Sequence, residues 1–178
     1  MTSQTTGRRG TRGFTLIETL IALVILAFGL LSLARVQAAA SLTEMEARQR
    51  AQAMALVLDM TDRINLNRRN AADYVGEFTA AVNANCASEV TTAARDVCNW
   101  QNLLSGDATH DGNRLTGAPI AAMGCITNPE PNVYTVSVAW QGLVETGAPL
   151  SPCGAGGYDT EARRRAFSTV LQIATLGT

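Results

Sequence analysis

Hydrophobic and polar positions divide the chain into an apolar run, an amphipathic stretch and a mixed remainder. The 21 residues from Phe14 to Ala34 carry a single charge, on Glu18. A helix of this length rises roughly 31 Å, which matches the hydrocarbon core of a bilayer. The pattern therefore predicts a transmembrane helix over residues 14–35.

The helix is expected to continue beyond the membrane, because the range between Phe14 and Asn70 has no proline and a single glycine, Gly29. Residues 36–70 form an amphipathic half, whose apolar positions recur at helical spacing. These positions are Leu42, Met45, Met54, Val57, Leu58 and Thr61. Acid–base pairs four residues apart support the same helix, namely Glu44 with Arg48, Glu46 with Arg50, and Asp59 with Arg63. Two helices with a bend at "AAAS" (38–41) remain the alternative.

Charges on either side of the apolar run give its orientation. Arg8, Arg9 and Arg12 precede it without an acid among them, whereas acids follow it. The positive-inside rule then places the N-terminus in the cytoplasm and the remainder outside. A secretory signal peptide, cut near Ala40 to release a soluble protein, is a second interpretation. Such peptides have a shorter, uncharged apolar centre.

Residues 71–178 are predicted to form a globular head with about three antiparallel strands. Residues 71–92 have no clear period and are interpreted as a partly helical connector. Residues 93–105 predict a helix, with Thr92 as N-cap and Gly106 just past its end. Its apolar face consists of Val97, Trp100, Leu103 and Leu104.

The clearest strand signal is "NVYTVSVAW" at 132–140, where apolar and small polar residues alternate strictly. Tyr134, Val136, Val138 and Trp140 would face the core, and Thr135, Ser137 and Ala139 would face solvent. Residues 166–176 predict a second strand and residues 119–127 a third. Strands packed on the outer half of the long helix give an α+β fold.

All the cysteines follow the predicted membrane segment: Cys86, Cys98, Cys125 and Cys153. An even number outside the cytoplasm favours two disulfides, with three connectivities open. Cys86 with Cys98 and Cys125 with Cys153 is the expected pairing, since the short helix keeps the first pair close. A loop of that size contributes about 3 kcal/mol in the chain-entropy model. Zinc is disfavoured because no C-x-x-C occurs.

Composition excludes several functional classes. The 178-residue chain has a net charge of −1, and all its basic residues are arginine. No general basic field exists for nucleic acid or anionic lipid, so nucleic acid is not an expected partner. Removing residues 1–13 would leave 11 arginines against 15 acids.

Three further features have ordinary interpretations. Asp107, Thr109, Asp111 and Gly112 echo the start of a calcium loop, but Ala118 replaces the terminal glutamate. They are interpreted as a turn. His110 is the single histidine and has no nucleophile or acid motif around it, so neither an enzyme nor a cofactor is expected. Arg163–Arg165 is interpreted as a solvated or edge-protecting cluster, with contact to DNA phosphates as the alternative.

The segment "RGTRGFTLIETL" (9–20) resembles the cleavage and methylation signature of type IV prepilins and related secretion-system subunits. The resemblance implies that a prepilin peptidase cuts after Gly13 and N-methylates Phe14. It also implies that Glu18 registers the subunit against its neighbour. A carboxylate within a bilayer costs about 2.5 to 3.5 kcal/mol, which such a contact would offset. The expected fold is pilin-like, with the long helix packed on a small sheet head.

Later motifs narrow the resemblance to minor pilins. The segments "DRINLNRRNAADY" (62–74), "RDVCNWQNLL" (95–104) and "VYTVSVAW" (133–140) resemble the type IV pilus modification protein PilV. Major pilins usually carry a kinking proline where this chain has Arg35, which also favours a minor subunit. The implied location is the inner membrane, with a periplasmic head, and then the pilus surface. The implied partners are other pilins, the assembly platform and membrane lipid. A minor pseudopilin of type II secretion and a DNA-uptake pilin remain alternatives.

Overall fold

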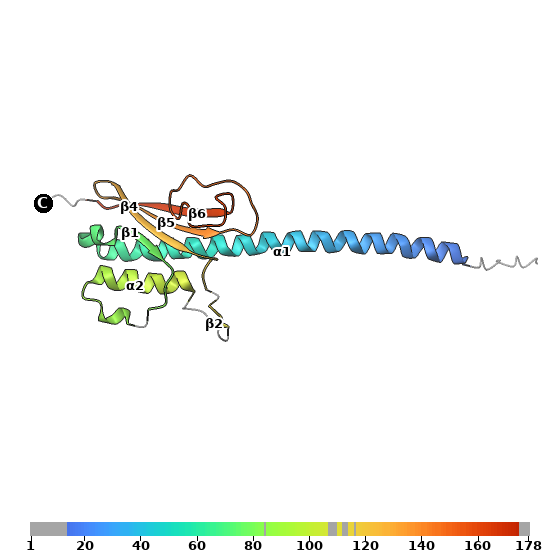
Figure 1. Cartoon of the computed structure of the whole chain (residues 1–178), viewed down its shortest axis with the longest axis horizontal. Helices are drawn as coiled ribbons and strands as arrows, with labels where there is room; N and C mark the ends of the chain where they lie inside the picture. The colour runs from blue at the N-terminus through green and yellow to red at the C-terminus, as the bar shows by residue number, and fades with distance from the viewer. Residues whose placement is uncertain (1–13, 84, 107–109, 112–113, 116, 175–178) are drawn as a thin grey trace, which may run out of the picture. The chain divides into compact units, whose positions relative to one another are not determined.

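The computed structural model describes residues 14–83, 85–106, 110–111, 114–115 and 117–174 (Figure 1). The chain divides into two compact units, residues 1–42 and residues 43–178. Helix α1, Leu16–Leu66, begins in the first unit and ends in the second. The helix has no break at the alanine run, so the prediction of one long helix is confirmed, with its end at Leu66 instead of residue 70.

Four antiparallel strands form the main sheet of the second unit, in the order β1-β4-β5-β6. Their bounds are Gly76–Thr79 (β1), Met123–Glu130 (β4), Val133–Gln141 (β5) and Arg164–Gln172 (β6). A separate two-stranded sheet pairs β2, His110–Asp111, with β3, Arg114–Leu115, inside the segment expected to be a loop. The α+β, pilin-like fold class is confirmed.

The β4–β5 hairpin closes at a tight turn, where Glu130 pairs with Val133. Asn132 lies in the turn with a φ of 63°, a left-handed conformation that asparagine tolerates. The side-chain amide of Asn128 donates to the carbonyl oxygens of Glu130 and Val133, each at 2.9 Å. A register shift between Thr127 and Glu130 accompanies this turn.

Three strand predictions need correction. The expected strand 119–127 lies instead at Met123–Glu130, and the expected strand 166–176 runs from Arg164 to Gln172. Strand β1 falls in the supposed connector 71–92, which also contains the 3-10 helix η2 at Cys86–Ser88 and the end of another, η1 at Arg68–Tyr74. With four residues, β1 is too short to show a sequence period of its own.

Helix α2 extends from Thr92 to Ser105. Its N-cap is Thr91, whose hydroxyl accepts a hydrogen bond from the Ala94 amide at 3.1 Å, so the expected cap at Thr92 was wrong by one residue. At the other end Gly106 adopts φ 84°, the left-handed C-cap expected from the sequence. α2 packs against η1, η2 and β1.

The core of the second unit lies between α1, α2 and the sheet. In Figure 1 the sheet lies on one side of α1 and α2 on the other. The buried stripe of α1 consists of Gln49, Ala53, Leu56, Val57, Met60 and Ile64. The sequence instead predicted a stripe that included Met54 and Leu58, which are each 47% exposed. The error arose because Gln49 and Ala53 do not look like core residues, although their spacing continues that of Met60 and Ile64.

Trp100 is the centre of this core. Its indole N–H donates to the Leu56 carbonyl of α1 at 3.0 Å, and its ring contacts Phe78 edge to face with centroids 6.1 Å apart. The ring also lies directly over Gly124 in β4, where a Cβ atom would come within 2.2 Å of it. One side chain therefore joins α2, α1 and two strands.

The outer face of β5 is also covered. Ser137 and Ala139 are buried, contrary to the expected half-buried strand with a solvent face. Ala139 clusters with Cys125 and Cys153, so the long loop between β5 and β6 covers this part of the sheet. The sequence of β5 alone does not indicate that the β5–β6 loop covers this face.

Candidate functional site

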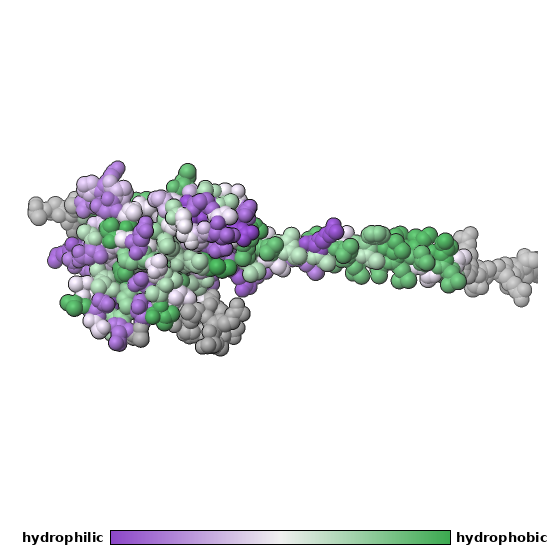
Figure 2. Space-filling model, viewed as in Figure 1, coloured by the Kyte–Doolittle hydropathy of each residue, from purple (hydrophilic) through white to green (hydrophobic). Residues whose placement is uncertain are grey.

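The first part of α1 is apolar and uncovered. All described residues from Phe14 to Leu42 are exposed. By length and composition this helix is able to cross a membrane, and its most apolar window buries none of its surface within the chain. Figure 2 shows the corresponding hydrophobic side chains around this part of the helix. A surface of this kind requires lipid or other helices around it.

Glu18 lies in the first turn of α1, two residues after the helix begins. Its carboxylate has no ion pair or hydrogen bond among the residues described here, and the neighbouring Thr19 hydroxyl bonds to the Leu16 carbonyl instead, at 2.9 Å. Phe14 precedes the helix and is 73% exposed. Gly13, the expected cleavage residue, lies outside the described residues. The acid is therefore available to a partner.

Two disulfides stabilise the head. Cys86–Cys98 joins η2 to α2, and Cys125–Cys153 joins β4 to the loop between β5 and β6. These are the pairs expected from the sequence. All four cysteines are buried or nearly so, and no cysteine of the described chain is free.

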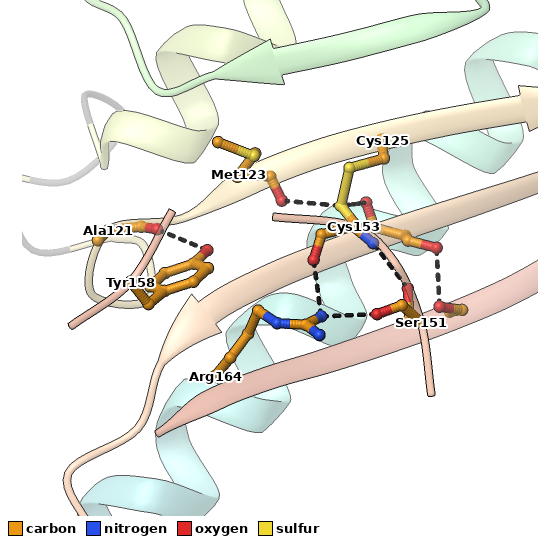
Figure 3. Close-up of a disulfide and its surroundings, with 9 residues drawn as sticks. Ala121, Met123, Cys125, Ser151, Cys153, Tyr158 and Arg164 are labelled. Atoms are coloured by element: carbon orange, nitrogen blue, oxygen red, sulfur yellow. Dashed lines mark hydrogen bonds between the residues drawn. A yellow bond between two sulfur atoms is a disulfide. The ribbon is translucent and has the colours of Figure 1, made fainter. Parts of the chain in front are cut away.

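Arg164 corrects the interpretation of the arginine cluster, because its side chain is only 5% exposed. The guanidinium donates to the carbonyl oxygens of Ser151 at 2.6 Å and Cys153 at 2.9 Å, and to Glu161 Oε2 at 2.7 Å. Figure 3 shows the bonds from Arg164 to Ser151 and Cys153, beside the second disulfide. The residue therefore holds the β5–β6 loop to the sheet, and it is unavailable to DNA phosphates.

Glu161 accepts hydrogen bonds both from Arg164 and from the backbone of the β5–β6 loop. Its other oxygen accepts the Gly156 amide at 2.8 Å. That backbone hydrogen bond, followed by the bond from Arg164, lowers the pKa of the carboxyl group. Glu161 therefore stays ionised and paired at neutral pH.

Arg164→Met should lower the free energy of unfolding by about 3 kcal/mol, because one buried carbonyl, one partly buried carbonyl and one carboxylate lose their donor. Arg163→Met is the matched control, since that side chain is 38% exposed and its acidic partners lie 3.6 and 3.9 Å away. Its effect should stay within about 0.5 kcal/mol. Denaturant unfolding of the full chain in detergent measures both. Equal losses in the two variants would contradict the role of Arg164.

Glu46 of α1 is a residue whose role the sequence did not reveal. It was expected to pair with Arg50, but its Oε1 accepts the backbone amides of Leu143 at 2.6 Å and Val144 at 3.2 Å. Arg165 lies 3.9 Å from the same oxygen. The other two predicted pairs form, Glu44–Arg48 at 2.8 Å and Asp59–Arg63 at 2.7 Å.

A polar network joins α1 to α2. Arg63 contacts Asp96 at 3.2 Å, and the Tyr74 hydroxyl donates to Asp96 at 2.6 Å. Burial and then the hydrogen bond to Asp96 raise the pKa of Tyr74 to about 12. The hydroxyl therefore remains protonated at neutral pH, and its stabilising contribution is lost only as the pH rises from about 10 through 12.

The remaining candidates lie in or near undescribed segments. Asp107, Thr109 and Gly112 of the calcium-like loop lie outside the described residues, and the side chains of His110 and Asp111 do too. Among the described residues no group of three or more histidine, cysteine, aspartate or glutamate side chains is arranged to hold a metal ion.

Comparison with known families matches residues 8–34 to the prokaryotic N-terminal methylation motif. The match contains Gly13, Phe14 and Glu18 and the start of the exposed apolar helix. No curated protein and no solved structure matches the chain. Together with the fold, the motif defines a type IV pilin- or pseudopilin-like protein, a class that is typically structural and non-enzymatic. The motif implies processing by prepilin peptidase, membrane anchoring and export.

Proposed function

We propose that the chain is a minor pilin, similar to PilV, that takes part in type IV pilus assembly. The observation that carries the proposal is the methylation motif leading directly into an uncovered apolar helix whose acid Glu18 has no described partner. A small disulfide-bonded sheet head follows that helix, as in a subunit that must survive outside the cell.

In the proposed sequence of events, the peptide bond between Gly13 and Phe14 is hydrolysed first, which removes residues 1–13. The new amine at Phe14 is then methylated and remains positively charged. Residues 14–35 hold the subunit in the inner membrane, and residues 36–70 carry the periplasmic head, 71–178. Other pilins and the assembly platform are the proposed partners.

Glu18 would then pair with the Phe14 amine of a neighbouring subunit. Since an isolated acid within a bilayer costs about 2.5 to 3.5 kcal/mol, pairing favours assembled over dispersed subunits. The apolar surface of α1 would exchange lipid for the helices of its neighbours, so that van der Waals contacts add to the ion pair.

A minor pseudopilin of type II secretion is the second candidate, because the methylation motif describes both classes. Quantifying the chain in fibres sheared from the cell surface separates them. A minor pilin should appear there with the major subunit and disappear when the pilus assembly platform is deleted. Retention in the cell envelope, with loss of secretion after deletion of the chain, would contradict the pilus role and support the pseudopilus.

A further inference from the structure

The end of the head where α1 gives way to η1 presents unpaired arginines beside open carboxamides. We propose that this surface, made by Asn65, Arg68, Arg69, Asn70 and Gln172, binds the acidic groups of a polysaccharide. The inference depends on the fold of the head and on its export, and on no step of fibre assembly.

Arg68 and Arg69 differ from most other arginines of the head. Both are exposed, and neither makes an ion pair or a hydrogen bond within the described chain. Arg63 and Arg164, in contrast, are held by carboxylates at 2.7 Å. Two arginines that are neighbours in sequence, and that have no partner among the described residues, are therefore available to an external anion.

Arg68 also lines two hollows of this surface. One, of about 300 Å³, is formed where the chain turns from α1 into η1, between Leu66 and Asn70. The other, of about 240 Å³, is formed with Asn65, Gln172 and Ile173. These volumes lie at or below the lower end of the usual range for ligand clefts, and they suit short ring-shaped groups better than a large ligand.

The lining has the chemistry of a sugar site. Asn65 and Gln172 are exposed, and their carboxamides have no partner within the described residues. Each carboxamide both donates and accepts hydrogen bonds, as a sugar hydroxyl does. Leu66, which is 88% exposed, offers an apolar surface to the C–H face of a ring. Figure 2 shows hydrophilic side chains gathered over this end of the head, with few hydrophobic ones between them.

The charge distribution favours an acidic polysaccharide over a nucleic acid. After residue 13 the chain has 11 arginines and 15 acids, so its overall field repels a densely charged phosphate backbone. Asp62 is exposed one turn before Asn65 and restricts the positive region to a small area. Phosphate oxygens accept hydrogen bonds but donate none, so the carbonyl oxygen of each carboxamide would have no donor from a phosphate.

The test uses the full chain, extracted in a nonionic detergent and immobilised, with oligogalacturonate as the carboxylated probe. Dextran sulfate, neutral dextran and duplex DNA are measured in parallel. The double variant Arg68→Gln/Arg69→Gln should weaken oligogalacturonate binding about tenfold or more, because each guanidinium supplies charge-assisted hydrogen bonds. Arg48→Gln/Arg50→Gln changes the net charge equally, but at exposed positions of α1, and should change the affinity less than about twofold.

Weaker binding in the first variant alone, with no binding to neutral dextran, supports the proposal. Dextran sulfate binding that is weakened by the same double variant would also support the proposal, because sulfate would then replace carboxylate in the same site. The proposal is overturned if oligogalacturonate does not bind, if both variants lose affinity equally, or if duplex DNA binds more tightly than either acidic glycan. Thermal unfolding of both variants should match that of the parent chain, since the altered side chains are exposed.

Discussion

Glu18→Ala is expected to leave leader cleavage intact and to lower the amount of the chain in sheared fibres about tenfold or more. The carboxylate has no partner among the residues that the structure describes, so its removal should not disturb the helix or the head. In the assembled state the same change would leave the Phe14 amine of a neighbour without its counter-charge inside the bilayer. Losing an interaction of about 1.4 kcal/mol already shifts an equilibrium tenfold, and the cost of an unpaired charge at this depth is larger.

Two variants make the Glu18 result specific. Glu18→Gln keeps the size of the side chain and should fail in the same way, because the proposed contact requires a charge. Glu44→Ala removes an exposed acid of the same helix that pairs with Arg48, and incorporation should remain close to the parent level. Normal incorporation of Glu18→Ala, measured by immunoblot of sheared fibres against the cell pool, would remove this account of the carboxylate.

Gly124→Ala is expected to destabilise the head by about 1 to 3 kcal/mol or more, although the substitution adds one methyl group. That methyl would lie 2.2 Å from the Trp100 ring. The ring is fully buried and its N–H is fixed to the Leu56 carbonyl, so neither the ring nor the strand has room to move without loss of packing. Denaturant unfolding, monitored by tryptophan fluorescence, measures the change.

Gly147→Ala is the matched control for this prediction. Apart from Gly147 itself and its two chain neighbours, no described atom lies within 4 Å of the position that a Cβ would take there, and the backbone conformation is open to alanine. Its free energy of unfolding should stay within about 0.5 kcal/mol of the parent value. Similar stability of Gly124→Ala and Gly147→Ala would show that Trp100 does not require the glycine.

The elements predicted correctly are those with strong local signals. The uninterrupted run before Leu66 predicts α1, the threonine and glycine at its ends predict α2, and strict alternation predicts β5. The disulfide pairing followed from the short separation of Cys86 and Cys98, with the other pair following from it. Each of these inferences depends on residues that are neighbours in the chain.

The elements missed depend on contacts between distant segments. β1 exists because β4 pairs with it, and four residues carry no period of their own. The buried face of α1 includes Gln49, whose side chain faces the backbone of Ile120, a partner far away in the sequence. Arg164 was interpreted as solvated because its partners, the carbonyls of Ser151 and Cys153, lie in a loop that its local sequence does not indicate.

The most direct test of the central claim is mass spectrometry of the N-terminal peptide of the membrane-extracted protein, without reduction. The account predicts a chain that starts at N-methylated Phe14 and has no free thiol, since both disulfides would be intact. A start near Ser41, or an intact Met1, would contradict it, because the helix would then be a secretion signal or a plain anchor.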